Sequence, residues 1–222
     1  QTLPDVGYIR ALSPENVLAL DPDLIIAEGD AGPPEAVEVL RSAGIPFILV
    51  PEATDPAGVG AKIKAVAEAL ALPDAGATLA AEVQAQLDTA AARAAAVMAP
   101  RRVLFVLSLQ GGAVMAGGEG TEAEGIIRLA GGENAATGFK GYKPMTDEAV
   151  LAARPDAILM MDREGNLAIS NAEILAQPAL SQSPAAQTES IIRLDGMLLL
   201  GFGPRTPEAA EALRGALYDS ES

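Results

Sequence analysis

The sequence predicts an α/β protein with two Rossmann-like lobes, whose mainly parallel sheets are bridged by one long α-helix. Three observations predict this fold: short apolar runs that alternate with helical patterns, an Ala-rich stretch at 76–99, and a repeat shared by the two halves of the chain. Half of the 222 residues are hydrophobic, so the chain can bury a sizeable core. Alternating helices and continuous apolar strands are typical of parallel sheets that are covered on both faces.

The expected strands are short runs rich in Ile, Val and Leu. They lie at 24–27, 45–50, 103–108, 157–161 and 190–194. Helical patterns lie at 13–20, 33–43, 56–72, 121–130, 146–154 and 206–218. Several of these patterns open with a start signal, because Ser13 and Thr146 precede an acidic first turn and Thr206 precedes a proline.

The stretch 76–99 predicts one long amphipathic helix. Apolar residues recur in this stretch at steps of three or four. After Gly76, the stretch contains neither Gly nor Pro. At 1.5 Å per residue this helix is about 35 Å long. We interpret it as a rigid link between two lobes; the alternative is a long edge helix on a single sheet. The predicted domains are an N-terminal lobe at 1–75, the linking helix at 76–99, a C-terminal lobe at 100–205, and a C-terminal helix and tail at 206–222.

An internal repeat supports the two lobes. Segments 13–27 and 146–160 are identical at seven of fifteen positions, and a Gly-Tyr pair precedes each copy. Tyr8 and Tyr142 therefore stand on equivalent loops and are candidate ligand contacts; the alternative is that each ring packs on a neighbouring helix. Glu15 and Glu148 are a second matched pair. One interpretation is that they stabilise the positive end of a helix dipole. The other is that they bind basic pockets on the surface of a partner.

Composition excludes several classes of function. Fifteen Lys and Arg against thirty Asp and Glu give a net charge of −15, which disfavours a nucleic-acid partner. The chain has no Cys and no His, so thiol nucleophiles, disulfides, imidazole ligands and Ser-His-Asp triads are excluded. No apolar run approaches the roughly 18–20 residues that cross a bilayer, and we expect a soluble chain. Any metal must be bound by oxygen or by a Met thioether.

The tyrosines are possible ligands of iron. A phenolate can bind Fe(III), but a nearby cation or the metal itself must stabilise its charge. Arg10 lies two residues beyond Tyr8, and Arg163 follows the strand at 157–161, at the end where open α/β sheets bind ligands. The Gly-rich segment 110–120 lacks the motifs of a nucleotide-binding loop, so we expect a hairpin or a close backbone approach there.

Four segments, taken together, resemble the haem-binding periplasmic proteins of bacterial haemin ABC importers. They are LPDVGYIRALSPE from position 3, LFVLSLQGG from 104, GFKGYKPMTDE from 138 and DGMLLLGFGPRT from 195. The resemblance implies two α/β lobes joined by a single long helix, with haem held between them. It also implies a periplasmic carrier that delivers haem to an ABC permease in the inner membrane. We expect a monomer without enzymatic activity.

The resemblance also implies a haem site. Tyr8 matches the axial iron ligand, and Arg163 is the best match for the Arg of the second lobe that supports the phenolate. Tyr142, Arg10 and Gln110 are expected to contact haem. Because the chain has no His, a sixth ligand must be water, a second Tyr such as Tyr142, or a Met.

Further expectations concern the surface and the extent of the first lobe. Glu15 and Glu148 match the acidic positions that engage the permease, and the haem propionates are expected on Arg10, Lys143 or Arg205. The family normally has a further βαβ stretch before the Gly-Tyr motif, so we expect the first lobe to be incomplete at its N-terminus. One alternative cargo is a ferric siderophore or a corrinoid. A small-molecule enzyme is less favoured, since the chain has no Gly-x-Ser-x-Gly elbow.

Overall fold

The computed structural model describes residues 4–162 and 169–219 and divides into two compact units. Unit 1 consists of Gln1–Glu52 and Ala61–Leu79, and unit 2 of Ala53–Gly60 and Ala80–Ser222. Two helices, α3 (Pro56–Ala69) and α4 (Pro73–Ala95), contribute residues to both units. None of the described helices combines the length and the apolar character that crossing a membrane requires.

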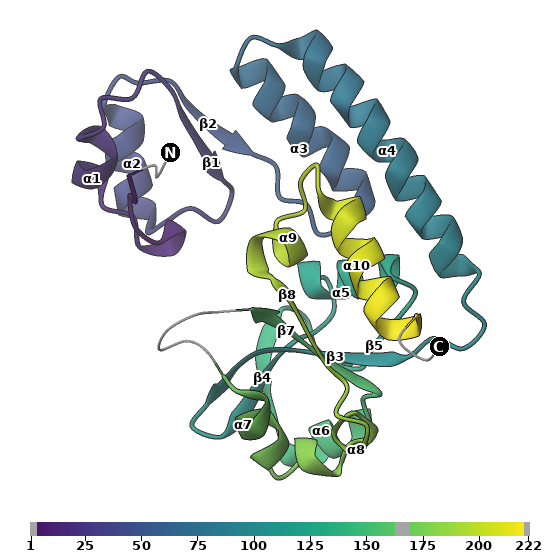
Figure 1. Cartoon of the computed structure of the whole chain (residues 1–222). Helices are drawn as coiled ribbons and strands as arrows, with labels where there is room; N and C mark the ends of the chain where they lie inside the picture. The colour runs from purple at the N-terminus through teal and green to yellow at the C-terminus, as the bar shows by residue number, and fades with distance from the viewer. Residues whose placement is uncertain (1–3, 163–168, 220–222) are drawn as a thin grey trace. The chain divides into compact units, whose positions relative to one another are not determined.

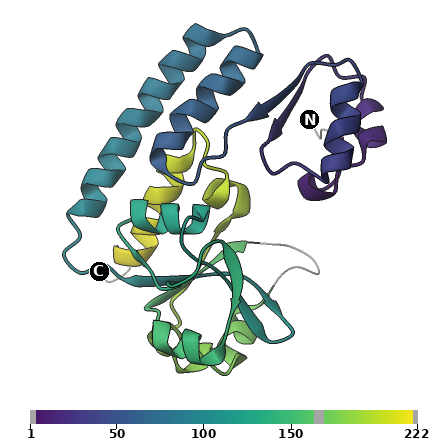
Figure 2. The ribbon, with the colours of Figure 1, turned by 180° about the vertical axis from the view of Figure 1, so that it is seen from behind.

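Unit 1 contains a two-stranded parallel sheet. Its strands are β1 (Ile25–Glu28) and β2 (Phe47–Val50), and its other elements are η1 (Ile9–Ala11), α1 (Pro14–Leu18) and α2 (Pro34–Ser42). Helices α1 and α2 lie on the same side of the strands (Figure 1), as the view from behind also shows (Figure 2). Leu40 and Val50 are buried, whereas Ile26 and its cross-strand partner Ile48 are each 36% exposed. The apolar core of unit 1 is therefore small.

Unit 2 is built on a mixed sheet in the order β6-β4-β3-β7-β8, with β5 paired to β3. The strands are β3 (Arg102–Gln110), β4 (Ala113–Gly117), β5 (Glu133–Asn134), β6 (Tyr142–Met145), β7 (Ala157–Asp162) and β8 (Ile191–Asp195). Strands β3, β7 and β8 are parallel, but β4 runs antiparallel to both β3 and β6. Most strand pairs are parallel, as expected, but the sheet of unit 2 is mixed, because the unpredicted strands β4 and β6 add two antiparallel pairs.

The Gly-rich segment after β3 forms the expected hairpin. Gly111 and Gly112 are the only residues between β3 and β4, and their φ angles are 58° and 88°. Two consecutive residues with positive φ are typical of a type I′ turn, whose twist matches that of the paired strands. A turn of this kind leaves no helix N-terminus next to β3, so the segment is not a phosphate-binding loop.

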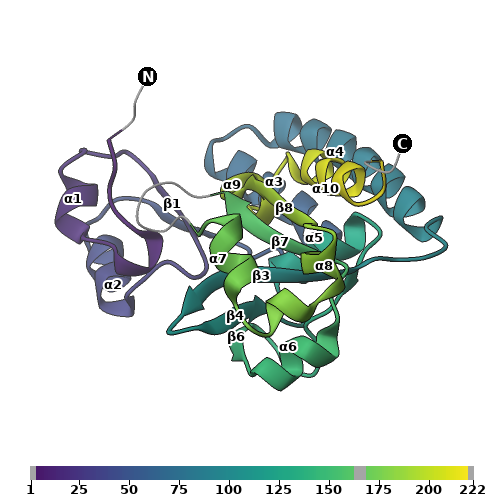
Figure 3. The same ribbon diagram turned by 60° about the horizontal axis from the view of Figure 1, so that its bottom comes forward.

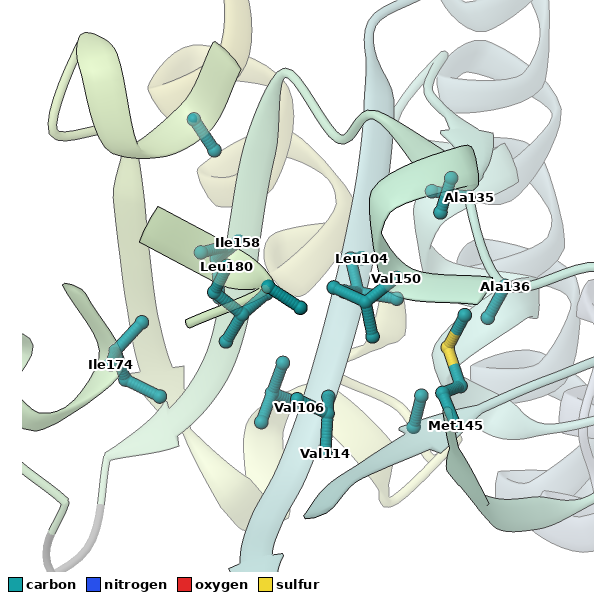
Figure 4. Close-up of a cluster of buried hydrophobic side chains, with 14 of the residues drawn as sticks. Leu104, Val106, Val114, Ala135, Ala136, Met145, Val150, Ile158, Ile174 and Leu180 are labelled. Atoms are coloured by element: carbon teal, nitrogen blue, oxygen red, sulfur yellow. The ribbon is translucent and has the colours of Figure 1, made fainter. Parts of the chain in front are cut away.

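Helices cover both faces of this sheet. In Figure 1, α5, α9 and α10 lie above it and α6, α7 and α8 lie below it, and Figure 3 shows the same unit tilted. Their bounds are α5 (Glu122–Leu129), α6 (Asp147–Ala153), α7 (Asn171–Ala176), η3 (Leu180–Gln182), α8 (Pro184–Gln187), α9 (Gly196–Leu200) and α10 (Thr206–Tyr218). Leu104, Val106 and Ile158 of the central strands pack with Val150 and Ile174 in one buried cluster (Figure 4). Burial on both faces explains why β7 reads as a continuous apolar run.

The sequence repeat is also a structural repeat. Helices α1 and α6 are each followed by a non-glycine residue in the left-handed region, Asp21 with φ 48° and Arg154 with φ 41°, at the same repeat position. A Pro-Asp pair and a parallel strand then follow in both copies. The glycines of the two Gly-Tyr pairs, Gly7 and Gly141, likewise have positive φ, at 99° and 74°. The two copies therefore share backbone conformation as well as residues.

Helix α4 differs from the prediction at both ends. It begins at Pro73 instead of Gly76, because proline is well suited to the first position of a helix, and it ends at Ala95 instead of 99. Gly76 lies inside it and packs against α3, where an added Cβ would be 2.2 Å from the Cβ of Ala67. The two helices therefore pack closely at this glycine.

The end of α10 is fastened to the start of β3. The Tyr218 hydroxyl donates to the Gly131 carbonyl at 2.7 Å and accepts from the Arg101 backbone N–H at 3.2 Å. The Arg101 guanidinium in turn donates to the carbonyls of Leu217 and Asp156, both at 2.9 Å. These bonds satisfy a carbonyl group that the helix end would otherwise leave without a partner.

Candidate functional site

Tyr8 stands at the entrance to η1 in unit 1. Asp5 Oδ1 accepts a 2.8 Å hydrogen bond from the N–H of Gly7, whose φ of 99° is accessible to glycine at little cost. The Tyr8 carbonyl then accepts a hydrogen bond from Ala11 and closes the first turn of η1. The Tyr8 side chain is 61% exposed. The local backbone thus presents a phenol ring to solvent.

Arg10 lies beside Tyr8 and is held by Asp30. Both Nε and one terminal nitrogen of Arg10 contact Asp30 Oδ2, at 2.8 and 2.7 Å. The hydrogen bond with Asp30 raises the pKa of Arg10, partial burial opposes this shift, and the charge and hydrogen bonding of Tyr8 reinforce it. Tyr8, Arg10 and Asp30 therefore form one interacting group, which we call the Tyr8 cluster.

Asp30 is the member of this cluster that the sequence reasoning missed. It follows the carboxyl end of β1, twenty residues beyond Arg10, and its loop is bonded to η1 on both sides of Arg10. The N–H of Gly32 donates to the Ile9 carbonyl and the N–H of Leu12 donates to the Gly32 carbonyl, each at 2.9 Å. The available signal was the position of an acidic residue just after a strand, where open α/β sheets bind ligands.

Tyr142 occupies a different setting in unit 2. It is the first residue of β6, and its hydroxyl donates to Glu122 Oε2 at 2.9 Å. Its ring meets the buried Phe105 ring edge to face, with centroids 6.1 Å apart. Tyr142 is half-buried, so the matched Gly-Tyr pairs place one tyrosine in solvent and the other against the sheet.

The remaining predicted contacts belong to unit 2 or lie outside the described residues. Gln110 is the last residue of β3, where its backbone pairs with Ala113. Lys143 of β6 and Arg205 before α10 are exposed. Arg163, the predicted support for the phenolate, lies outside the described residues.

Glu15 and Glu148 have the same local geometry in the two copies of the repeat. Each is the second residue of its helix, after Ser13 or Thr146 as N-cap. The hydrogen bond from its own backbone N–H lowers the pKa of each carboxylate, and the N-cap hydroxyl lowers it further. Both side chains are exposed.

One cavity of unit 2 is lined by none of the predicted site residues. This cavity, of about 460 Å³, is lined by residues such as Thr54, Asp55, Glu124 and Arg128. The Arg128 guanidinium is paired with Glu124 at 3.0 Å. Among the described residues, no group of three or more acidic side chains could hold a metal ion. The Tyr8 phenol oxygen is a different kind of donor, and it suits Fe(III).

Comparison with known proteins gives a consistent result. The family model described as periplasmic binding protein matches residues 1–198. The solved structure of the periplasmic heme-binding protein BhuT in complex with two hemes has a TM-score of 0.90 and 41% identity, covering 99% of this chain and 84% of that one. The apo structure of the periplasmic heme-binding protein RhuT from Roseiflexus sp. RS-1 has a TM-score of 0.92 and 37% identity, with the same coverage.

A relative with lower sequence identity than these two structures is a substrate-binding lipoprotein. The uncharacterized ABC transporter substrate-binding lipoprotein YvrC of Bacillus subtilis strain 168 is 24% identical over 207 residues. The match covers 92% of this chain but only 64% of YvrC.

Proposed function

Because this chain belongs to the periplasmic binding protein family, we propose that it binds ferric haem through the Tyr8 phenolate and carries it to an ABC permease. The family membership confirms the prediction of a binding protein instead of an enzyme. The resemblance to haem-binding periplasmic proteins is confirmed as well, since BhuT and RhuT are such proteins. The transport context is supported by YvrC, which is a substrate-binding protein of an ABC transporter.

The observation that carries the haem proposal is the exposed Tyr8 phenol beside a fixed guanidinium. A phenolate is an anionic oxygen ligand that suits Fe(III), and a neighbouring cation favours the charged form that the metal needs. Arg10 supplies that cation, and Asp30 holds it with two nitrogen-to-oxygen contacts. Haem enters this scheme as cargo, so the protein's own task is to bind and orient it.

The other predicted contacts remain part of the proposal. Gln110 and Arg163 are proposed to contact haem from the second lobe. The hydroxyl of Tyr142 is bonded to Glu122, which supports a role for its ring as a wall of the site over a role as sixth ligand. We further propose a periplasmic location, a monomer, a two-lobed carrier with α4 as the link, and Glu15 and Glu148 as the contacts to an inner-membrane permease.

Titration with haemin tests the proposal directly. Ferric haem added at about micromolar concentration to the purified protein should give an absorption spectrum with a phenolate-to-iron charge-transfer band. Tyr8→Phe should abolish this band and weaken binding at least tenfold, because it removes the anionic ligand. Tyr142→Phe is the matched control and should keep the band, since its hydroxyl is bonded within unit 2.

Two results would contradict the proposal. Absence of haem binding by the wild-type protein would favour a ferric siderophore or a corrinoid as cargo, and the same titration with those compounds would then follow. A band that survives in Tyr8→Phe but disappears in Tyr142→Phe would move the iron ligand to unit 2.

A further inference from the structure

We propose that Gln177 is a positioning residue for the docking carboxylate Glu148, because its buried amide bonds the start of α6 to the central sheet of unit 2. This inference rests on the proposed delivery of haem to a permease and deepens it. It assigns a role to a residue that contacts neither haem nor the permease in that scheme. It also makes the two docking carboxylates, Glu15 and Glu148, unequal.

The Gln177 side chain joins three segments of unit 2. Its Oε1 accepts a hydrogen bond from the Leu180 N–H at 2.7 Å, at the start of η3. Its Nε2 donates to the Gly112 carbonyl at 3.3 Å and to Asp147 Oδ1 at 3.2 Å. Because a backbone N–H can only donate, the amide oxygen is the atom that faces Leu180. The two N–H groups of the amide are then directed to the other two segments.

Burial makes this arrangement specific. Gln177 is 6% exposed, so a hydrogen bond that its amide loses is not readily replaced by one with water. Buried polar groups that have all their partners fix one arrangement of the segments around them. The hairpin, the start of α6 and η3 are therefore held together by one side chain.

The contact reaches Glu148 through its neighbour in the chain. Asp147 is the first residue of α6 and Glu148 is the second. At the other end, Gly112 belongs to the turn that follows β3, which pairs with β4 on one side and β7 on the other. Bonding to this turn fixes the start of α6 relative to the sheet. The exposed carboxylate of Glu148 is thereby presented at a defined place on the surface.

The first copy of the repeat is built differently at this point. Pro14 stands at the position of Asp147, and its ring has no atom that could accept a hydrogen bond. None of the five residues of α1, all of them described, is buried, whereas Val150 and Ala153 of α6 lie in the buried cluster (Figure 4). A group that is already fixed loses less conformational freedom on binding. Glu148 should therefore be the stronger of the two docking contacts.

The test measures stimulation of the cognate permease's ATPase in liposomes by each variant saturated with haem. Gln177→Met should lower stimulation by about twofold to threefold, because the thioether keeps the volume but loses the hydrogen bonds. Its affinity for haem should not change. Gln182→Met is the matched control, since Gln182 is an exposed residue of η3 whose amide donates to the Pro178 carbonyl. It should stimulate like the wild type.

Combination with the docking variants separates positioning from a general loss of stability. A destabilised protein would lose stimulation by the same factor in every background. If Gln177 acts through Glu148, Gln177→Met should have no further effect in the Glu148→Gln background. In the Glu15→Gln background it should lower stimulation by the same factor as in the wild type. Glu148→Gln alone should lower stimulation more than Glu15→Gln alone.

Variants of Asp147 separate the hydrogen bond from the charge. Asp147→Asn should stay near the wild type, because its amide oxygen still accepts from Gln177. Asp147→Ala should match Gln177→Met. Asp147 is exposed, so this pair of variants tests the proposal even if Gln177→Met does not fold. Equal losses in both variants would assign the effect to the charge of Asp147 and overturn the role of Gln177.

Other outcomes are equally decisive. Unchanged stimulation by a folded Gln177→Met protein would overturn its role, as would a full further loss in the Glu148→Gln background. Circular dichroism of each variant checks that the fold is kept. A wild-type protein that binds haem without stimulating the permease would instead overturn the proposed delivery. A wild-type protein that does not bind haem would overturn the haem function itself.

Discussion

Glu15 and Glu148 occupy the same position in the two copies of the repeat, as the second residue of a helix. In both copies of the repeat the carboxylate accepts hydrogen bonds from its own backbone N–H and from the N-cap side chain, and this lowers its pKa. A carboxylate with a lowered folded pKa adds stability above its unfolded pKa of about 4.3 and loses that contribution as the pH falls through the folded value. Both side chains therefore remain anionic in neutral and mildly acidic media.

We expect these two carboxylates to contribute to docking on the permease. The double variant Glu15→Gln/Glu148→Gln should lower the haem-dependent stimulation of the cognate permease's ATPase in liposomes by roughly threefold to tenfold, because exposed interface charges control encounter. Haem binding should not change. Glu208→Gln, an exposed acidic residue in the first turn of α10, is the control and should stimulate like the wild type. Full stimulation by the double variant would rule out the docking role.

At the site, the sequence predicted Tyr8 and Arg10 but not Asp30. Those two residues are close in the chain, so a motif could pair them. Asp30 joins them only because β1 returns the chain to η1, and no local pattern encodes that return. The matched Gly-Tyr pairs also differ in secondary structure: Tyr8 precedes η1, whereas Tyr142 is the first residue of β6, a strand that was not predicted.

At the scale of elements, the packing of α3 on α4 depends on a glycine. We expect Gly76→Ala to lower the free energy of unfolding by about 1–3 kcal/mol, because its Cβ would overlap the Cβ of Ala67 at 2.2 Å. This cost exceeds the gain of about 1 kcal/mol in helix propensity. Gly60→Ala in α3 is the matched control, since its Cβ would meet nothing within 4 Å, and it should be neutral or stabilising. Urea denaturation of both variants measures the difference, and equal effects would contradict the close packing.

Elements with strong local signals were predicted well. Helix α10 has the predicted bounds, because a proline marks its start, although Arg205 and not the predicted Thr206 is its N-cap. Strands β3 and β7 were found because burial on both faces makes them continuously apolar. Strand β4 was missed because its short apolar run lies inside a Gly-rich segment, and β6 was missed because Lys143 and Pro144 interrupt its apolar pattern. The pairing of both strands depends on partners elsewhere in the sheet.

At the scale of the whole molecule, the two units differ in how much apolar surface they bury. Unit 1 relies on a two-stranded sheet with few buried side chains, whereas unit 2 has a sheet covered on both faces. Two-stranded sheets are marginally stable without further packing. Unit 1 should therefore open more often than unit 2 under native conditions.

Hydrogen exchange measures this difference. We expect the amides of β1 and β2 to exchange at least tenfold faster than those of β3 and β7, and haem to slow exchange in the segment around Tyr8, since a ligand stabilises the state it binds. The amides of β3 and β7 serve as the internal reference and should be unaffected by haem. Equal protection of the two units without haem would contradict the expectation.

The fastening of α10 has a mechanical consequence. Tyr218 and Arg101 join the last turn of the helix to the segment that enters β3, through hydrogen bonds of 2.7 to 3.2 Å. The last turn of α10 is therefore coupled directly to the central strand of the sheet, and a displacement of that turn would be passed to β3 through these hydrogen bonds.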